Sequence, residues 1–543
     1  MKIAAYAPKI VLGDPRKNAG ILGSAMEEAA EKGAEWLVFP RLSLCGCTCG
    51  SLLGQEVLRE GCEAALTELL GVSERLPGLT TVVSLPRLTN RMRLQTRVLL
   101  LREGKVIREE KLHEDGVLDL DEIVLCLPDL PGVVNGRTRL CTMAEGLARP
   151  AVVVTPGAGE SGTDGVYTGG TAIADISGCL GYAEGELLLC DTERDAFEPV
   201  YEKEWEGLRN PTDPFFPYGG EDTARRCERI LALQSRGLAD RMARSGCRKL
   251  VLGLSGGLDS TWALLVGAEA LGLVGEERSA LLAVTMPGFG TVSRTRSNAE
   301  IMASALGVRF REIPIGAAAE LHLRDIGHDP ENRNAAYENA QARERTQILM
   351  DLSNDENALV LGTGDLSELA LGWCTYNGDH MSMYGVNAAL PKTGVRRCTR
   401  WYAETRAEGE LKTALLDVLD TPVSPELLPG AGDEISQSTE AILGPYELHD
   451  FFLWHFLRHG TKPSELYRSA CEAFEGRYES DVIETTLRTF LRRFFTQQFK
   501  RSCLPDGPVL WEGVSLSPRT AWHMPSDVGS APWIAELDRA LDE

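Results

Sequence analysis

Apolar runs and amphipathic stretches alternate along the second half of the chain. The apolar run at 250–254 predicts a buried strand, and residues 261–271 predict the helix that follows it. By the same pattern we predict strands at 280–285, 309–315 and 358–362, and helices at 221–245, 294–306 and 336–352. This order is typical of a doubly wound parallel sheet, an α/β fold in which ligands gather at the carboxyl ends of the strands.

The first two hundred residues predict a separate α/β layer. Strands are expected at 2–6 and 36–39, and helices at 18–32 and 64–76. A stretch rich in proline and glycine, EGLRNPTDPFFPYGG, then interrupts the periodicity and reads as a linker. We therefore predict a domain at 1–200, a linker at 201–220 and a second domain at 221–543, which ends in a helical extension containing helices at 446–459 and 481–495.

The segment VLGLSGGLDS places a glycine turn between the strand at 250–254 and the following helix. Gly256 and Gly257 let the backbone come close to an anion, and amides at a helix N-terminus favour phosphate. Ser255 and Ser260 add hydroxyl donors, and Asp259 is placed to hold a magnesium ion against the same phosphates. The alternative is an ordinary glycine turn of an α/β unit.

Other strand ends carry polar groups as well. TMPGFGT follows the strand at 280–285, where an adenine could pack. Asn339 and Arg343 share one helical face, and an arginine fork suits phosphate oxygens, although a solvated charged helix would look the same. In GTGDLSELALGW, Thr363 is placed for a nucleotide and Glu368 supplies a carboxylate to oppose Asp259.

Aromatic residues follow that block. Trp373 and Tyr376 beside Asp379 suit a flat heteroaromatic ring, or they belong to the core. Lys392 adds a cation, and Cys374 is expected to serve packing.

Composition narrows the class of protein. The 543 residues are 43% hydrophobic and 25% charged, as in a soluble globular protein, and no apolar run approaches a membrane span, so we expect a cytoplasmic protein. The net charge of −23 disfavours a broad nucleic-acid surface. Of the 14 cysteines only Cys45, Cys47 and Cys49 cluster, which argues against a zinc site.

The motif SGGxDS resembles the pyrophosphate loop of ATP pyrophosphatases, which cleave ATP between its α and β phosphates. Together with TMPGFGT, YENAQARERTQ, GTGDLSELALGWCTYNGDHMSMYGVNA and RRFFTQQFKRSCLPDGP, it closely resembles the synthetase domain of NAD synthetase from about residue 221 to the C-terminus. The resemblance implies that deamido-NAD is adenylated with ATP and magnesium and then amidated by ammonia, which gives NAD, AMP and pyrophosphate. It also implies a homodimer or larger homo-oligomer.

Site residues follow from the resemblance and from the residue types above. We expect ATP at Gly253, Leu254, Ser255, Gly256, Gly257, Leu258, Asp259, Ser260 and Thr363, with magnesium at Asp259 and Glu368. We expect deamido-NAD at Asn339, Arg343, Glu368, Trp373, Tyr376, Asp379 and Lys500, and we assign catalysis to Asp259, Glu368 and Lys392.

The first domain resembles the nitrilase-like glutaminase domain of glutamine-dependent NAD synthetases, in AEWLVFPRLSLCGCTCGSLL and TPGAGESGTDGVYTGGTAIADISG. Where the family has a glutamate as general base, this chain has Arg41, which cannot accept a proton. Lys111 falls at the position of the catalytic lysine. The block that carries the nucleophile is missing, and Cys141 is the nearest cysteine. Several tens of residues are missing between Pro131 and Pro156, so the domain reads as shortened and degenerate.

We therefore predict that the enzyme uses ammonia and that glutamine is a doubtful donor. Three alternatives stay open at this point: an NAD synthase that still hydrolyses glutamine, a non-catalytic NAD or ATP sensor, and a tRNA thiolation enzyme, which the acidic charge disfavours.

Overall fold

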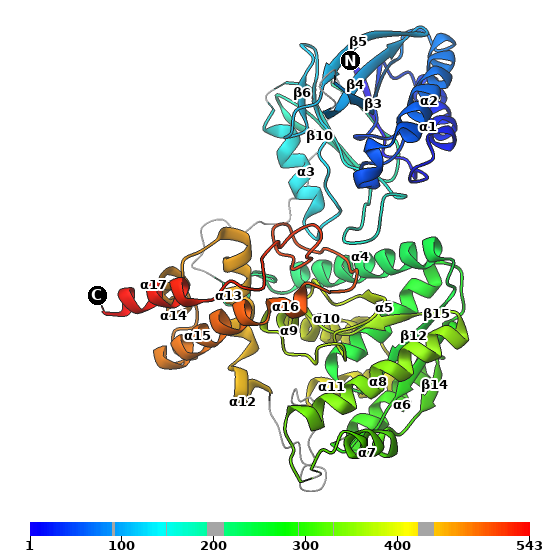
Figure 1. The fold of residues 1–543 in the computed structure, drawn as a ribbon. Coiled ribbons are helices and arrows are strands. Elements are labelled where there is room, and N and C mark those ends of the chain that lie inside the picture. The colour runs from blue at the N-terminus through cyan, green and yellow to red at the C-terminus, as the bar shows by residue number, and fades with distance from the viewer. Residues whose placement is uncertain are drawn as a thin grey trace. The chain divides into compact units, whose positions relative to one another are not determined.

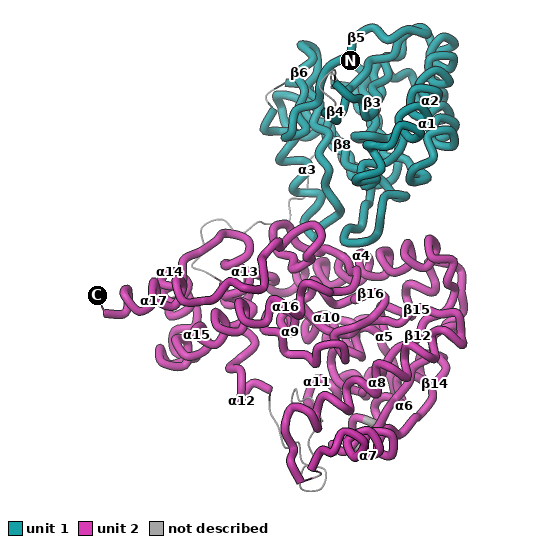
Figure 2. The backbone as a smooth tube through the Cα atoms, in the orientation of Figure 1, with its two compact units in different colours: residues 1–204 teal, residues 205–543 magenta. Residues whose placement is uncertain are grey.

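The computed structural model describes residues 1–89, 93–147, 149–192, 211–290, 293–329, 331–421 and 439–542. The chain divides into two compact units, residues 1–204 and 205–543 (Figure 2). Half of the predicted linker, 201–210, lies outside the described residues. Our domain boundaries at 200 and 221 therefore stay a prediction.

The first unit contains two sheets. The six-stranded sheet has the order β11-β1-β2-β3-β4-β5, and the five-stranded sheet has the order β10-β9-β8-β7-β6. The strands are β1 (Lys2–Ala5), β2 (Trp36–Val38), β3 (Thr80–Leu88), β4 (Leu94–Arg102), β5 (Lys105–Lys111), β6 (Val117–Asp119), β7 (Val124–Cys126), β8 (Ala151–Val154), β9 (Gly170–Asp175), β10 (Gly178–Glu184) and β11 (Leu188–Asp191). The helices are α1 (Pro15–Glu31), α2 (Glu56–Glu74), α3 (Gly136–Glu145) and the short 3-10 segment η1 (Cys47–Gly54).

Successive side chains of a strand point to opposite faces of its sheet, so these elements pack in four layers. Ile3 and Ala5 point into the core between the two sheets, whereas Ala4 points to the core under α1 and α2. On the far side, α3 packs on β8, β9 and β10. The first unit is thus two sheets packed face to face, with helices outside each, which confirms the α/β class expected for it.

The second unit is built on a parallel sheet with the order β14-β13-β12-β15-β16. Its strands are β12 (Lys249–Gly253), β13 (Leu281–Thr285), β14 (Arg309–Glu312), β15 (Ala358–Gly362) and β16 (Tyr384–Gly385). From β12 the chain goes first to β13 on one side and later to β15 on the other, so the strand order reverses next to β12. A crevice opens at the carboxyl ends of the strands where the order reverses, and this places the site.

Helices cover this sheet and extend from it as a helical layer (Figure 1). They are α4 (Glu221–Ser245), α5 (Leu258–Leu273), α6 (Ser293–Leu306), α7 (Gly316–Asp325), α8 (Ala335–Glu356), α9 (Leu366–Leu371), α10 (Lys392–Thr405), α11 (Gly409–Leu419), α12 (Thr439–Leu443), α13 (Tyr446–His459), α14 (Pro463–Ala473), α15 (Ser480–Thr496), α16 (Gln498–Arg501) and α17 (Ala531–Asp542), with a 3-10 turn η2 (Arg278–Ala280). Among the described helices, none has the length and apolar character needed to cross a membrane.

Most predicted elements of the second unit lie within a few residues of their observed bounds, and the differences have local causes. α5 begins at Leu258 rather than Thr261 because Gly257 is its extended N-cap, which brings Asp259 into the first turn. The predicted strand 309–315 ends at Glu312, two residues before Pro314, a residue that cannot donate to a ladder. In the first unit, α2 begins at Glu56 and not at Ala64. The prediction started too late because residues 56–61 include no buried position and carry little apolar periodicity.

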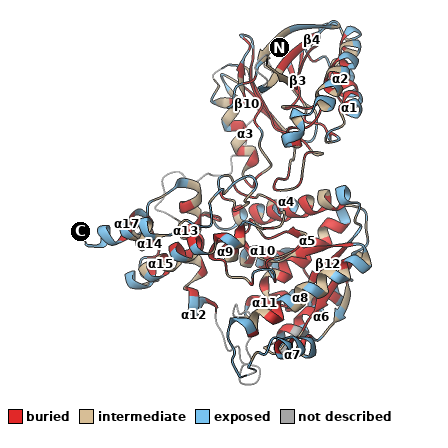
Figure 3. Cartoon of the chain, in the orientation of Figure 1, coloured by how far each residue is buried: buried red, intermediate tan, exposed pale blue. Residues whose placement is uncertain are grey.

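The helical layer has an aromatic core that fixes α13. Phe451 and Phe452 of α13 and Phe490 and Phe494 of α15 are all fully buried. Their rings meet one another and neighbouring aromatics in edge and tilted contacts. Burial of such rings stabilises the layer by about 2 kcal/mol per side chain. Figure 3 shows α13 largely buried beside α9.

One buried histidine makes the stability of this layer depend on pH. His449 of α13 is 1% exposed, and its Nε2 lies 2.9 Å from Leu443 O. Burial lowers the pKa of His449 from 6.5 to about 4. The folded chain therefore keeps a neutral imidazole, whereas the unfolded chain binds a proton below pH 6.5. We expect the contribution of His449 to the free energy of unfolding to be fully present above pH 6.5. It should fall by about 2 kcal/mol between pH 7 and pH 5.

Urea denaturation of the parent and of His449→Gln at both pH values measures this effect. The variant should lose about that part of the pH dependence. An identical fall in both proteins would contradict the assignment to His449.

Candidate active site

The turn between β12 and α5 has a backbone that requires glycine. Gly256 has φ of +82°, and a Cβ added there would lie 1.9 Å from Thr295 O. The turn is fixed from within, because Gly257 N–H donates to Ser255 Oγ (3.1 Å) and the Ser255 and Ser260 hydroxyls lie 3.0 Å apart. The turn thus opens α5 with its first amides directed at the carboxyl edge of the sheet.

A cavity of about 540 Å³ lies at this edge. The β12–α5 turn, the carboxyl end of β13, one face of α8 and the segments 360–363 and 372–381 line it, together with Arg493 and Lys500. All expected ATP residues line this cavity except Gly256: Gly253, Leu254, Ser255, Gly257, Leu258, Asp259, Ser260 and Thr363. Met286, from TMPGFGT, lines it too.

A buried ion cluster lies beside the turn. Lys392, at the start of α10, has a side chain that is 3% exposed, and its Nζ lies 2.6 Å from Asp259 Oδ2, 2.9 Å from Asp365 Oδ2 and 2.8 Å from Glu368 Oε1. Asp259 comes from α5, whereas Asp365 is the N-cap of α9 and Glu368 follows it by three residues. One ammonium group thus holds carboxylates from two helices.

The pKa shifts of the cluster follow from burial and from its charges. Burial acts to lower the pKa of Lys392, but the carboxylates of Asp259, Asp365 and Glu368 together raise it well above its usual value. Burial raises the pKa of Glu368 to about 7, which Lys392 opposes and Asp259 reinforces. Burial likewise raises the pKa of Asp365. Three carboxyl groups face one ammonium, so full ionisation of the set would leave an excess of negative charge.

That excess fits a divalent cation. Oxygen atoms of Asp259, Asp365 and Glu368 lie within 4.8 Å of one another. Asp259 Oδ1 is buried and accepts no hydrogen bond from the described residues. An acidic set of this size with an unused buried oxygen is the donor type that magnesium prefers.

The predicted dinucleotide residues divide into two groups. Asn339, Glu368, Trp373, Asp379 and Lys500 line the cavity. Lys500 Nζ donates to Gly372 O (2.8 Å) and Cys374 O (2.6 Å), which holds α16 over the 372–374 segment.

Arg343 and Tyr376 do not line the cavity. Arg343 is exposed, and its Nε donates to Tyr376 O (3.3 Å). Arg345, a second basic residue beside Arg343 that we did not assign to the site, lines the cavity instead, with Nε 3.0 Å from Met286 O. Its position two residues after Arg343 was visible in the sequence, but the direction in which each side chain points was not.

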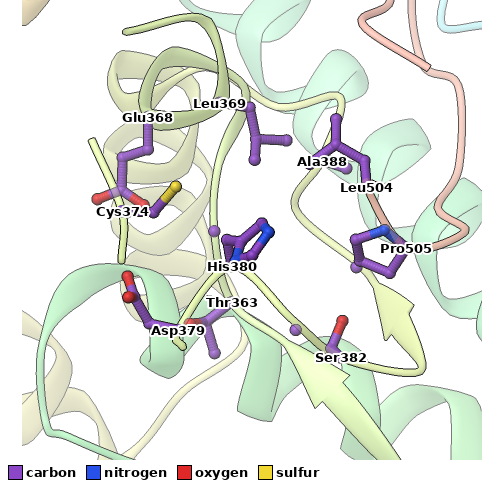
Figure 4. Close-up of a pocket in the computed structure, with 13 residues that line it drawn as sticks. Thr363, Glu368, Leu369, Cys374, Asp379, His380, Ser382, Ala388, Leu504 and Pro505 are labelled. Atoms are coloured by element: carbon purple, nitrogen blue, oxygen red, sulfur yellow. The ribbon is translucent and has the colours of Figure 1, made fainter. Parts of the chain in front are cut away.

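A smaller chamber of about 40 Å³ shares Thr363, Glu368, Cys374 and Asp379 with the main cavity. Figure 4 shows Glu368 and Cys374 on one side of it and Leu504 and Pro505 on the other. Burial raises the pKa of Asp379 and raises that of the Cys374 thiol to about 12, so Cys374 is a neutral thiol.

In the first unit, the expected glutaminase positions lie in unlike surroundings. Arg41 follows β2, Lys111 is exposed at the end of β5, and Cys141 lies within α3. Cys141 is fully buried in an apolar cluster, 3.1 Å from Cys179 Sγ, and its hydrogen bond with Cys179, together with burial, raises the pKa of its thiol. No hydrogen bond or ion pair described for these three residues joins one to another.

A glycine turn that opens a helix beside an acidic cluster, at the point where the strand order of a parallel sheet reverses, is typical of a nucleotide-binding α/β enzyme. The NAD synthase family model matches residues 230–486. Glutamine-dependent NAD(+) synthetases of Mycobacterium leprae and Mycobacterium tuberculosis are each 32% identical to this chain, over 671 and 669 residues, and in each case the alignment covers 100% of this chain and 98% of the relative. The chain belongs to the family of glutamine-dependent NAD(+) synthetases and is an NAD synthase.

Solved structures agree on the fold. A glutamine-dependent NAD(+) synthetase from Cytophaga hutchinsonii has a TM-score of 0.77 at 17% identity, with 99% of each chain covered. One from Acinetobacter baumannii, solved with adenosine diphosphate, has a TM-score of 0.63 at 19% identity and covers 96% of this chain and 97% of that one. The nitrilase-like first domain and the parallel-sheet second domain are therefore confirmed.

The alignments also show that this chain is short. The alignment with the Mycobacterium leprae protein extends over 671 positions, whereas this chain has 543 residues, so about 128 positions of the alignment hold no residue of this chain.

Gly256 offers a test of the turn. Gly256→Ala places Cβ against the Thr295 carbonyl at positive φ, so we expect the turn to shift and NAD formation to fall at least about 100-fold. The control is Gly272→Ala in α5, where nothing lies within 4 Å of an added Cβ. The control should keep full activity and gain up to about 1 kcal/mol of stability. Steady-state NAD formation and thermal unfolding of both variants measure the two effects.

Proposed function

We propose that this NAD synthase adenylates the nicotinate carboxylate of deamido-NAD at the Lys392 cluster and takes its nitrogen from free ammonia. The observation that carries the adenylation site is the meeting of Asp259, Glu368 and Lys392 beside the glycine turn. The roles below are assigned on that arrangement.

The β12–α5 turn would hold the phosphates of ATP. Its amides and the Ser255 and Ser260 hydroxyls are donors that face the cavity, and the N-terminus of α5 adds a favourable dipole. Lys392 does not line the cavity, and its buried ammonium lies against both predicted metal ligands, so it would act by holding Asp259 and Glu368 in place beside the turn. Asp259 and Glu368, with Asp365 beside them, would hold magnesium, which supplies charge neutralisation for the phosphates when bound.

Asn339, Trp373 and Asp379 would place the dinucleotide so that its carboxylate meets the α-phosphorus in line. Attack of the carboxylate forms a carboxyl–phosphate bond and releases pyrophosphate, which gives the carbonyl carbon AMP as a leaving group. Ammonia then attacks the carbonyl carbon and forms the C–N bond. The bond between that carbon and the bridging oxygen breaks, AMP leaves with its electron pair, and the nitrogen loses a proton. This sequence requires no covalent intermediate on the protein.

The proposal of free ammonia rests on the first unit. Glutamine hydrolysis by a thiol requires an activated nucleophile with a base beside it. Cys141 is a buried thiol of raised pKa inside α3, Lys111 is exposed at the end of β5, and Arg41 cannot act as a base. The shortfall of about 128 aligned positions supports the same conclusion.

Another thiol of the first unit, Cys47, has acidic neighbours and is not activated by them. Its Sγ lies 3.2 Å from Asp129 Oδ1, and its N–H donates to the buried carboxylate of Glu160 (2.9 Å). Burial, with the negative charges of Glu160 and Asp129, raises the pKa of the Cys47 thiol. A neutral thiol beside carboxylates is a poor nucleophile.

The 40 Å³ chamber beside Glu368 and Asp379 is large enough for a molecule the size of water and borders the cavity where the carboxylate would be activated. We propose it as the place from which ammonia attacks.

Asp259→Asn tests the adenylation site. The change removes one negative charge and keeps the shape, so we expect ATP–pyrophosphate exchange dependent on deamido-NAD to fall at least about 100-fold with little change in thermal unfolding. Asp240→Asn serves as control, because Asp240 is paired with Arg236 on α4 and lies outside the cavity. Exchange at the parent rate in Asp259→Asn would refute the assignment.

The nitrogen donor is tested by NAD formation with ammonium chloride and with glutamine. We expect saturable activity with ammonium, and with glutamine less than about one hundredth of that rate and no release of glutamate, because the Cys141 and Cys47 thiols have raised pKa values. Cys141→Ala should match the parent with either donor. Rapid use of glutamine by the parent would refute the proposal and leave the adenylation site untouched.

A further inference from the structure

Asp450 is a buried carboxylate that reaches the adenylation site from the helical layer. It lies in α13, is 2% exposed and does not line the ATP cavity. A carboxylate in such a place requires hydrogen-bond donors to stay ionised, and the donors it uses indicate what it holds.

All three donors belong to the two segments that carry Glu368 and Lys392. Ser367 Oγ donates to Asp450 Oδ1. Thr393 N–H (3.0 Å) and Thr393 Oγ1 (2.6 Å) both donate to Asp450 Oδ2. Ser367 Oγ in turn accepts from Lys392 N–H (2.8 Å). Ser367 directly precedes Glu368, and Thr393 directly follows Lys392.

These contacts replace the missing N-cap of α10. The N-cap residue of α10 is Pro391, whose side chain has no acceptor, and no side chain of α10 itself caps the helix. The first amides of a helix otherwise remain without partners, and a carboxylate at this end is favoured by the helix dipole. Ser367 from α9 and Asp450 from α13 supply the acceptors, so the start of α10 is tied to both helices.

A second residue of α13, Tyr446, lies against Lys392 itself. The ring of Tyr446, one turn before Asp450, lies 5.4 Å from Lys392 Nζ, and Tyr446 is 3% exposed. The aromatic core fixes α13 itself, so Asp450 is a rigid anchor.

We propose that Asp450 is a positioning residue for adenylation: it caps α10 from outside, joins α10 to α9, and so sets the distance between Lys392 and Glu368. Asp450 touches neither ATP nor deamido-NAD. Its loss should therefore lower the rate of adenylation and leave the binding of deamido-NAD, which Asn339, Trp373 and Lys500 govern, nearly unchanged. This inference rests on the proposed function of the site.

The test compares three variants of the full chain in deamido-NAD-dependent ATP–pyrophosphate exchange. Asp450→Ala leaves the Thr393 donors unpaired, and a displacement of Lys392 by about 1 Å is expected to lower kcat about 100-fold, with KM for deamido-NAD within about threefold of the parent. Asp450→Asn keeps an oxygen for Thr393, and its kcat should lie between those of Asp450→Ala and the parent. Asp222→Ala is the matched control: Asp222 is 8% exposed and paired with Arg226 within α4, away from the cavity.

The outcomes separate the two proposals. A parent without exchange would refute the proposed function. If the parent is active, the positioning role is supported by a lower kcat with nearly unchanged KM in Asp450→Ala. Asp450→Asn should partly restore this kcat, and Asp222→Ala should not show the loss. A kcat of Asp450→Asn within twofold of the parent, or a loss equal to that of Asp222→Ala, overturns that role. Should Asp450→Ala not fold, Asp450→Asn, which preserves shape, decides the question by the same measurements.

Discussion

The second unit depends on one buried ammonium group. Lys392 Nζ lies within 3 Å of carboxylates on α5 and α9, and α10 supplies the lysine. A buried charge without partners would cost several kcal/mol, so each member of this cluster requires the others. Because the three helices start at the carboxyl edge of the sheet, the cluster forms where the glycine turn opens. The contacts that hold these three helices together therefore also place the charged groups of the site.

The sequence alone predicted the parts of this site that are local. The turn with Asp259, the α9 block with Glu368 and most ATP residues are contiguous motifs whose geometry follows from strand–turn–helix rules. The direction in which a side chain points could not be predicted from the sequence as well. Arg343 and Arg345 are both candidates on spacing, and only the packing of α8 directs Arg345 into the cavity. The roles assigned to these residues stay predictions.

Long-range partners could not be predicted at all. Asp450 lies 83 positions from Ser367, and nothing in the local pattern of α13 marks it as a cap for another helix. Asp365 caps α9, which is a local contact, but it also faces Lys392, which lies 27 positions further along the chain. In the first unit most strands escaped prediction, and strands such as β3, β8 and β9 are buried on both faces, so they show neither clean alternation nor helical periodicity.

The two units show how differently a fold and a site depend on sequence. The first unit keeps its four layers because its apolar positions still alternate between two cores, and alternation tolerates many substitutions. A thiol site tolerates few, since it needs a base, a lysine and an accessible sulfur within hydrogen-bond reach of one another. Arg41 lies in the turn after β2, Lys111 at the end of β5 and Cys141 inside α3, so all three fit the fold, and the loss of the thiol site remains our proposal. A fold of this kind can keep its shape without a thiol site, whereas in the second unit the charges to which we assign the chemistry also hold α5, α9 and α10 together.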